Sequence, residues 1–234
     1  ADHTRWAPVL PGLQKHFTVT VFDRRGRGAS GDGDRYALDR EVEDVVAIVG
    51  TLRPPVLLFG HSYGGICSLE AASRTTVAGL LLYEPPVVFG ERKIYTREQL
   101  HQLEALLAAD DREQVIATFM KEIVHLTPEA INAARSSPAW AARVASAHTL
   151  PRELRAQAEY RFCATRFNGL KSPRFLLLGN DSPAFFASAA ESLANGLPRS
   201  RLLRMAGQQH IAMDTAPDIV VRAILDFQHV ISAA

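Results

Sequence analysis

The chain has 234 residues, with 26 Lys and Arg against 25 Asp and Glu and a formal net charge of +1. This length suits one domain, or one domain with an inserted subdomain, and the balanced charge disfavours a nucleic-acid or membrane-surface partner. The apolar runs are far shorter than the ~20 residues that cross a bilayer, and two cysteines cannot build a disulfide framework. We therefore expect a cytoplasmic protein, although the chain does not begin with Met and a removed leader stays open.

The first part of the chain predicts alternating helices and strands. Apolar residues at helical spacing alternate with short runs rich in β-branched, aromatic and aliphatic residues. The expected elements are helices at 6–16, 38–50 and 66–73 and strands at 17–22, 56–59 and 78–83. The strands lack a polar face, which favours a mostly parallel sheet covered by helices on both faces. The predicted fold class is therefore α/β.

Between residues 87 and 170 the pattern changes to helices only. One helix start is predicted at Thr127-Pro128, where a capping hydroxyl precedes a first-turn proline. The alternation then resumes with strands at 174–178 and 201–205 and helices at 184–195 and 217–232. We expect residues 1–86 and 171–234 to form a core and residues 87–170 to form an inserted helical cap.

A candidate nucleophile lies between a predicted strand and a predicted helix. The run Gly60-His61-Ser62-Tyr63-Gly64 matches G-x-S-x-G in that context. Glycines beside the serine allow a sharp, strained turn that presents the hydroxyl to a substrate. In the alternative interpretation, Ser62 only caps the following helix. We favour Ser62 as a nucleophile.

Serine is a weak nucleophile and needs an adjacent base, for which histidine is the usual residue. Among the eight histidines, His210 follows the last predicted strand in the loop 207–210, at the same edge of the sheet as Ser62. His61 lies within the turn itself and cannot readily reach back to its neighbour. The other histidines lie in the insertion or on terminal helices. His210 is therefore the predicted general base.

These motifs resemble the α/β-hydrolase family, in particular its bacterial esterase, lactonase and cofactor-free haloperoxidase-like group. The resemblance covers nearly the whole chain and rests on FDRRGRGASGD at 22–32, GHSYGG at 60–65, the helical insertion, FLLLGNDSP at 175–183 and GQQH at 207–210. It implies an oxyanion hole with the Tyr63 amide as one donor. The family's second donor lies on a strand before a segment like residues 1–6, so we expect the N-terminal strands to be missing from the chain.

Two carboxylates compete to orient His210. Asp181 follows the predicted strand 174–178 in the place where family members most often keep their acid. It stands two residues after Gly179, whereas the commoner spacing is three and falls on Ser182. Glu84 follows the predicted strand 78–83 and is the alternative acid, since some α/β-hydrolases carry it there. Asp181 is favoured, and a helix cap is its alternative role.

The resulting hypothesis is a serine hydrolase that cleaves an ester or lactone of a small molecule through an acyl-enzyme on Ser62. Two alternatives stay open: a ligand-binding protein that keeps the fold without turnover, and a perhydrolase that uses the same triad. No cofactor is expected, and no metal site, because histidines and carboxylates show no ligand spacing.

Overall fold

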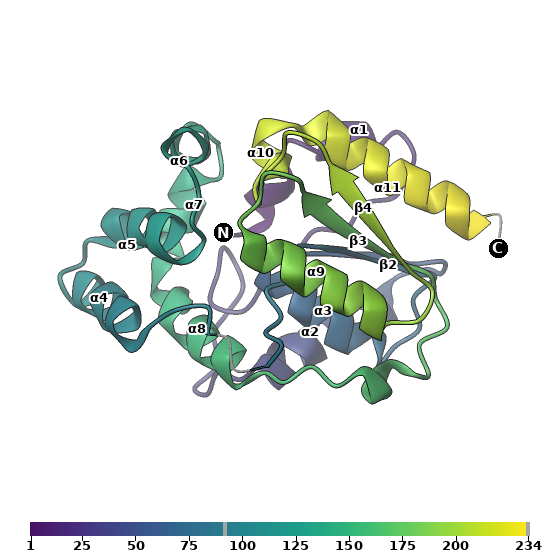
Figure 1. Ribbon diagram of the computed structural model, residues 1–234, viewed down its shortest axis with the longest axis horizontal. Coiled ribbons are helices and arrows are strands. Elements are labelled where there is room, and N and C mark those ends of the chain that lie inside the picture. Colours follow the sequence, from purple (N-terminus) through teal and green to yellow (C-terminus); the bar gives the residue numbers. More distant parts are fainter. Residues whose placement is uncertain (91–92, 233–234) are drawn as a thin grey trace. The chain divides into compact units, whose positions relative to one another are not determined.

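Four parallel strands form one sheet in the order β1-β2-β3-β4 (Figure 1). The structure is a computed structural model that describes residues 1–90 and 93–232. The strands are β1 (Leu57–His61), β2 (Gly79–Tyr83), β3 (Arg174–Gly179) and β4 (Ser200–Met205). Every residue of the two central strands, β2 and β3, is buried, which explains why their sequences have no polar face. The predicted parallel α/β sheet is confirmed.

Helices cover both faces of this sheet. The register pairs Leu57 with Gly79 and Gly60 with Leu82, so Gly60 and Gly79 face opposite sides. Gly60 lies against α3, and Gly79 against Phe227 of α11. Figure 1 shows α3 and α9 on one face and α11 on the other, with α2 against α3. These helices are α2 (Leu38–Thr51), α3 (Tyr63–Ala72), α9 (Ala184–Gly196) and α11 (Pro217–Ser232).

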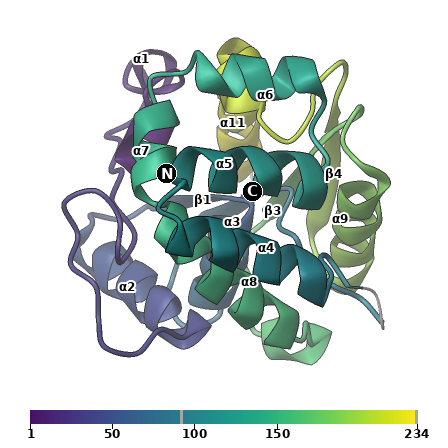
Figure 2. The same ribbon diagram turned by 90° about the vertical axis from the view of Figure 1, so that its left-hand side faces the viewer.

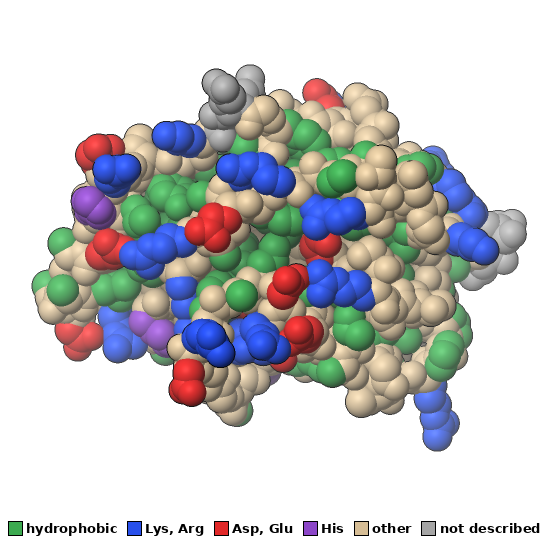
Figure 3. All heavy atoms as spheres, turned by 90° about the horizontal axis from the view of Figure 1, so that it is seen from below, with side chains coloured by type: hydrophobic (Ala, Val, Ile, Leu, Met, Phe, Trp, Pro, Cys, Tyr) green, Lys and Arg blue, Asp and Glu red, His purple; other side chains and the backbone are tan. Residues whose placement is uncertain are grey.

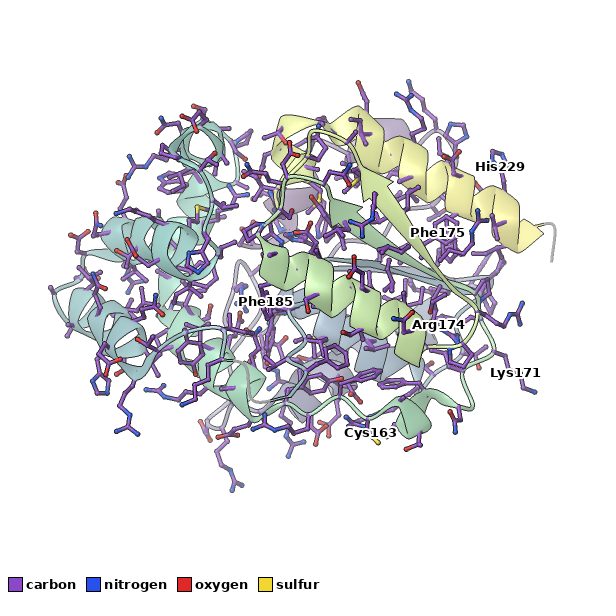
Figure 4. The ribbon with its side chains drawn as sticks, in the orientation of Figure 1. Cys163, Lys171, Arg174, Phe175, Phe185 and His229 are labelled. Carbon is purple, nitrogen blue, oxygen red and sulfur yellow. The ribbon has the colours of Figure 1, made fainter. Side chains whose placement is uncertain are left out.

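A contact between two tilted aromatic rings holds α11 on its face of the sheet. Phe175 of β3, labelled in Figure 4, packs on Phe227 with ring centroids 4.4 Å apart. A side chain at position 79 would overlap Phe227, because an added Cβ atom would lie 2.8 Å from its ring. Glycine at the start of β2 therefore lets the helix approach the strand closely.

The strand predicted at 17–22 is wrong. Within the described residues this segment pairs with no strand, and the described sheet begins with β1. A β-branched sequence becomes a strand only when a neighbouring strand accepts its hydrogen bonds. The predicted helix at 6–16 is also shorter than expected: it divides into a turn at His3–Trp6 and α1 (Leu10–Leu13).

The chain divides into two compact units that are described separately. The first unit contains Ala1–Tyr36, Lys93–Arg155 and Ile211–Val221, and the second contains Ala37–Arg92, Ala156–His210 and Arg222–Ala234. The whole sheet belongs to the second unit. The predicted division into a core and a cap at residues 87–170 stays a prediction.

Short helices make up most of the first unit. They are α4 (Arg97–Ala108), α5 (Arg112–Thr118), α6 (Pro128–Arg135), α7 (Trp140–Ala145) and α10 (Ala212–Thr215), with α8 (Leu150–Glu159) beginning in this unit. Figure 2 shows α4 and α5 side by side. The hydroxyl of Thr127 accepts a hydrogen bond from the Ala130 amide at 3.3 Å, so Thr127 caps the start of α6 as predicted. A π-helical turn, Phe119–Ile123, follows α5.

Arginines surround two buried carboxylates of the first unit. Asp214 accepts from Arg5, from Arg143 at 2.8 Å and from the Ser137 hydroxyl at 2.9 Å. The Asp214 side chain is 2% exposed. Burial disfavours its charge, but the two guanidinium groups outweigh burial and hold the pKa of Asp214 below its ordinary value.

Glu153, in the same unit, lies in a similar cluster. It accepts from Arg27 and from Arg24, the latter at 2.9 Å, and burial is again outweighed, so its pKa is lowered. On the face of the molecule in Figure 3, basic and acidic side chains are interspersed. No helix in the described part of the chain is long and apolar enough to cross a membrane.

Candidate active site

Ser62 occupies a strained turn between β1 and α3 in the second unit. Its backbone has φ 54° and ψ −130°, a conformation that is rare for a residue with a side chain. Its amide donates to the Tyr83 carbonyl at 2.9 Å, and its hydroxyl makes no capping bond to α3. The helix-cap interpretation is therefore not supported, and the turn has the geometry that presents a nucleophile.

Close packing explains which glycines the turn needs. A Cβ atom on Gly60 would lie 2.5 Å from the Ser68 hydroxyl and 2.6 Å from the Gly64 carbonyl oxygen. A Cβ atom on Gly65 would lie 3.0 Å from Pro85. Gly64 itself has open space around the corresponding position. The tight return of the helix towards the strand thus depends on Gly60 and Gly65 more than on Gly64.

Glu84 repeats the position of Ser62 on the neighbouring strand. His61 and Tyr83 are paired in the register, so Ser62 and Glu84 are the residues that directly follow the two strands. Glu84 also has a positive φ, 44°, and its amide donates to the Leu177 carbonyl at 3.1 Å. The carboxyl ends of β1 and β2 therefore carry two strained residues with reactive side chains next to each other.

The Glu84 carboxylate binds His210 directly. Its Oε2 lies 2.6 Å from His210 Nδ1, and Oε1 accepts from the Gly179 amide at 2.7 Å and from the Ser182 hydroxyl at 2.5 Å. Glu84 is 0% exposed and His210 is 5% exposed. Because a carboxylate accepts at Oε2, Nδ1 is the donor, and the neutral ring then has Nε2 as its proton acceptor. This is the arrangement of a general base oriented by an acid.

Asp181, the acid that the sequence favoured, lies elsewhere. It is exposed, and its amide donates to the Gln208 carbonyl at 2.9 Å. Among the described residues, the carboxylate that contacts His210 is that of Glu84. The physical reason is spacing: Ser182, three residues after Gly179, is the residue whose side chain reaches this site, and Asp181 is one residue short. The geometry favours Glu84, the alternative acid.

A tight loop and two rings hold His210. Gly207 has φ 69°, which permits the turn after β4, and the ring of Phe186 stacks on the His210 ring at 4.2 Å with an interplanar angle of 18°. Phe186 lies in the first turn of α9, next to Phe185, which Figure 4 labels at the start of that helix. The His61 ring lies 4.5 Å from the His210 ring. Sequence reasoning missed both neighbours.

Tyr63 is the first residue of α3, directly after Ser62, and is buried. The first N–H groups of a helix point out of its N-terminal end, and this end favours a negative charge. The position suits a donor to an oxyanion that forms on a carbonyl attacked by Ser62.

One group of possible metal ligands lies apart from these residues, in the first unit. Asp2, His3 and Asp23 lie close enough to share an ion. The Asp23 carboxylate already accepts the amides of His3 and Ala29, at 2.7 and 3.0 Å, and pairs with the His3 ring. The cluster is therefore satisfied by its own hydrogen bonds.

Comparisons with known proteins agree with this architecture. The sequence model of the Alpha/beta hydrolase family matches residues 1–223. An alpha/beta hydrolase from Sphaerobacter thermophilus is 32% identical, with a TM-score of 0.82 over 97% of this chain and 88% of that one. A thermophilic esterase from Thermogutta terrifontis shares the fold, with 22% identity and a TM-score of 0.66 over 98% of this chain and 86% of that one.

A curated protein also matches part of the chain. YqjL from Bacillus subtilis is 22% identical over 102 residues, which are 42% of this chain. The match spans 40% of the length of that relative.

Proposed function

Because the chain belongs to the alpha/beta hydrolase family, we propose that it is a serine hydrolase that cleaves a carboxylic ester or lactone of a small molecule. Ser62 is the nucleophile, His210 the general base and Glu84 the acid that orients it. The observation that carries the proposal is the buried contact of 2.6 Å between Glu84 Oε2 and His210 Nδ1, next to the strained turn at Ser62. The esterase from Thermogutta terrifontis, which has the same fold, supports ester chemistry as the first to test.

The proposed reaction has two steps. His210 Nε2 takes the Ser62 proton as the hydroxyl oxygen attacks the substrate carbonyl, and the negative Glu84 carboxylate stabilises the imidazolium that forms. The Tyr63 amide donates to the oxyanion, and His210 returns the proton to the leaving alcohol. Water, activated by the same histidine, then attacks the acyl-enzyme and releases the acid. Proton and charge return to the starting state, so neither step needs a cofactor.

Fluorophosphonate labelling followed by intact-mass measurement tests the nucleophile. Wild type should gain one adduct, and Ser62→Ala should gain none. Ser68→Ala is a matched control, because Ser68 is a buried serine on α3, the helix that follows Ser62, and its loss should leave labelling unchanged. An adduct that survives in Ser62→Ala would assign the reactive group elsewhere. A folded wild type that never labels would overturn the serine-hydrolase proposal.

Turnover separates ester chemistry from other reactions of the fold. Wild type should hydrolyse p-nitrophenyl acetate and a small lactone, and His210→Ala should lose nearly all of this activity. Labelling at Ser62 without hydrolysis of either substrate would retain the nucleophile and reject the proposed ester or lactone class.

A further inference from the structure

We propose that His61 and Tyr83 are positioning residues that hold the backbone of the His210 loop, so that the imidazole meets both Glu84 and Ser62. The inference rests on the proposed function in one respect: His210 must be the base. It goes beyond that function because it concerns hydrogen bonds to the backbone of the His210 loop and not bonds to the reacting atoms. Both act on the backbone carbonyls of the loop.

Three successive carbonyls of the loop accept hydrogen bonds from three different strand ends. The Gln208 carbonyl accepts from the Asp181 amide at 2.9 Å, beyond the end of β3. The Gln209 carbonyl accepts from the Tyr83 hydroxyl, at the end of β2. The His210 carbonyl accepts from His61 Nε2 at 2.7 Å, at the end of β1. Each bond fixes a different peptide of the loop.

His61 links the nucleophile and the base. A carbonyl oxygen can only accept, so His61 Nε2 must be the atom that carries the proton. Its ring lies 4.5 Å from the His210 ring, at 40°. Because His61 directly precedes Ser62, one side chain ties the turn of the nucleophile to the backbone of the base. A shift of the His210 loop would therefore break this bond.

Tyr83 provides the second link through its hydroxyl. Its ring is 0% exposed and lies 5.0 Å from His61 and 6.2 Å from His210. Tyr83 also directly precedes Glu84. The residues before the nucleophile and before the acid, which are paired in the sheet register, thus both donate to the loop of the base. A displacement of about 1 Å between catalytic groups can cost on the order of 10²-fold in rate.

The first test compares single variants with p-nitrophenyl acetate as substrate. Tyr83→Phe keeps the ring and removes the hydroxyl, and His61→Met removes the donor while filling similar space. Each should lower kcat about tenfold with KM within about twofold, because misalignment affects the proton transfer more than binding. His61→Gln retains an N–H donor and should recover much of the rate. A mere packing role would make the Gln and Met variants equal.

Two matched controls lie elsewhere in the second unit. Tyr160→Phe removes another buried hydroxyl, which donates to Glu70 at 2.7 Å. His229→Gln changes an exposed histidine near the end of α11, labelled in Figure 4. Both should keep the wild-type kcat. Equal losses in Tyr160→Phe and Tyr83→Phe would indicate a general effect of losing a buried hydroxyl and would overturn the inference.

Hydrogen–deuterium exchange gives a readout that does not need turnover. The peptide covering 206–212 should exchange faster in Tyr83→Phe and His61→Met than in wild type and in both controls. Unchanged exchange and unchanged kcat in an active protein would overturn the positioning role alone. A wild type that never labels at Ser62, with exchange still faster in the variants, would overturn the proposed function and keep the loop restraint.

Discussion

Three buried carboxylates, Glu84 in the second unit and Asp214 and Glu153 in the first, have different kinds of partner. In the second unit, Glu84 binds one imidazole and two uncharged donors. In the first unit, Asp214 and Glu153 each bind two arginines. All three acids are shielded from water, so burial alone does not distinguish them.

The partner decides what a buried acid can do. A guanidinium stays charged at any physiological pH, so the pairs of the first unit hold a fixed charge and serve stability. An imidazole can accept a proton from one group and release it to another, so the charge beside Glu84 can change during a reaction. The comparison assigns a structural role to Asp214 and Glu153 and a chemical role to Glu84. Substituting these carboxylates one at a time tests the assignment.

The largest expected effect is the loss of activity in Glu84→Gln. The amide carries no charge to stabilise the imidazolium and can favour the wrong tautomer of His210, which costs on the order of 10⁴-fold in kcat in a comparable triad. The rate of p-nitrophenyl acetate hydrolysis measures this. Asp181→Asn is the matched control and should stay within about twofold of wild type. The opposite ranking of the two variants would return the role of the acid to Asp181.

The next effect is a loss of stability in Asp214→Asn. Removing one member of a buried ion cluster leaves Arg5 and Arg143 without their shared counter-charge, at a cost of about 3–5 kcal/mol. Urea unfolding followed by circular dichroism measures the free energy of unfolding. Glu113→Gln is the control, because Glu113 is exposed and its ion pair with Arg135 is long, at 4.0 Å, and also exposed. Equal unfolding midpoints in the two variants would show that the cluster adds no stability.

The arginine clusters also predict how stability depends on pH. The pKa values of Asp214 and Glu153 are lowered from ordinary values of 3.8 and 4.5, so the unfolded state binds protons at a higher pH than the folded state. The two carboxylates contribute fully to the free energy of unfolding when the pH is above their ordinary pKa values. This contribution is lost as the pH falls through their lowered, folded-state pKa values. Below about pH 4, the free energy of unfolding should fall by up to about 1.4 kcal/mol per pH unit for each group.

Urea unfolding at a series of pH values tests this sign. Asp214→Asn should show a shallower fall below pH 4 than wild type, because one of the two groups no longer titrates. A slope equal to that of wild type would mean that Asp214 does not contribute to the acid limb.

Much of the fold could be read from local sequence signals. Thr127-Pro128 marked a helix start, and the limits of α11 agree with the prediction at 217–232. The serine turn and the His210 loop were found because glycines mark both. The strand prediction at residues 17–22 was wrong, because a segment forms a strand only beside a partner strand, and the local sequence pattern does not show whether a partner is present.

The acid was harder to choose for a geometric reason. Two details decide which side chain reaches His210. Asp181 stands two residues after Gly179 instead of three, and Glu84 has a positive φ. Composition shows neither. Ser182 at the expected acid position, together with Glu84 before two prolines, was the signal for the alternative. The contact from His61 to a backbone carbonyl had no sequence signal, because any residue type can supply that acceptor.

The smallest expected effect is a modest loss of kcat in Ser182→Ala, which separates the role of the Glu84 charge from that of its uncharged donors. Ser182→Ala removes one of the two uncharged donors on Glu84 Oε1 and leaves the Gly179 amide in place. A hydrogen bond to a charged group contributes about 1.5–3 kcal/mol. Because the Gly179 amide still donates to the same oxygen, we expect kcat to fall by only about fivefold to tenfold. The free energy of unfolding should change far less than in Asp214→Asn. Ser172→Ala is the control, since Ser172 is a half-buried serine preceding β3 and should leave kcat unchanged. If Ser182→Ala lost as much activity as Glu84→Gln, the hydroxyl would take part in the proton transfer itself, and uncharged donors could not be treated as mere supports of the acid.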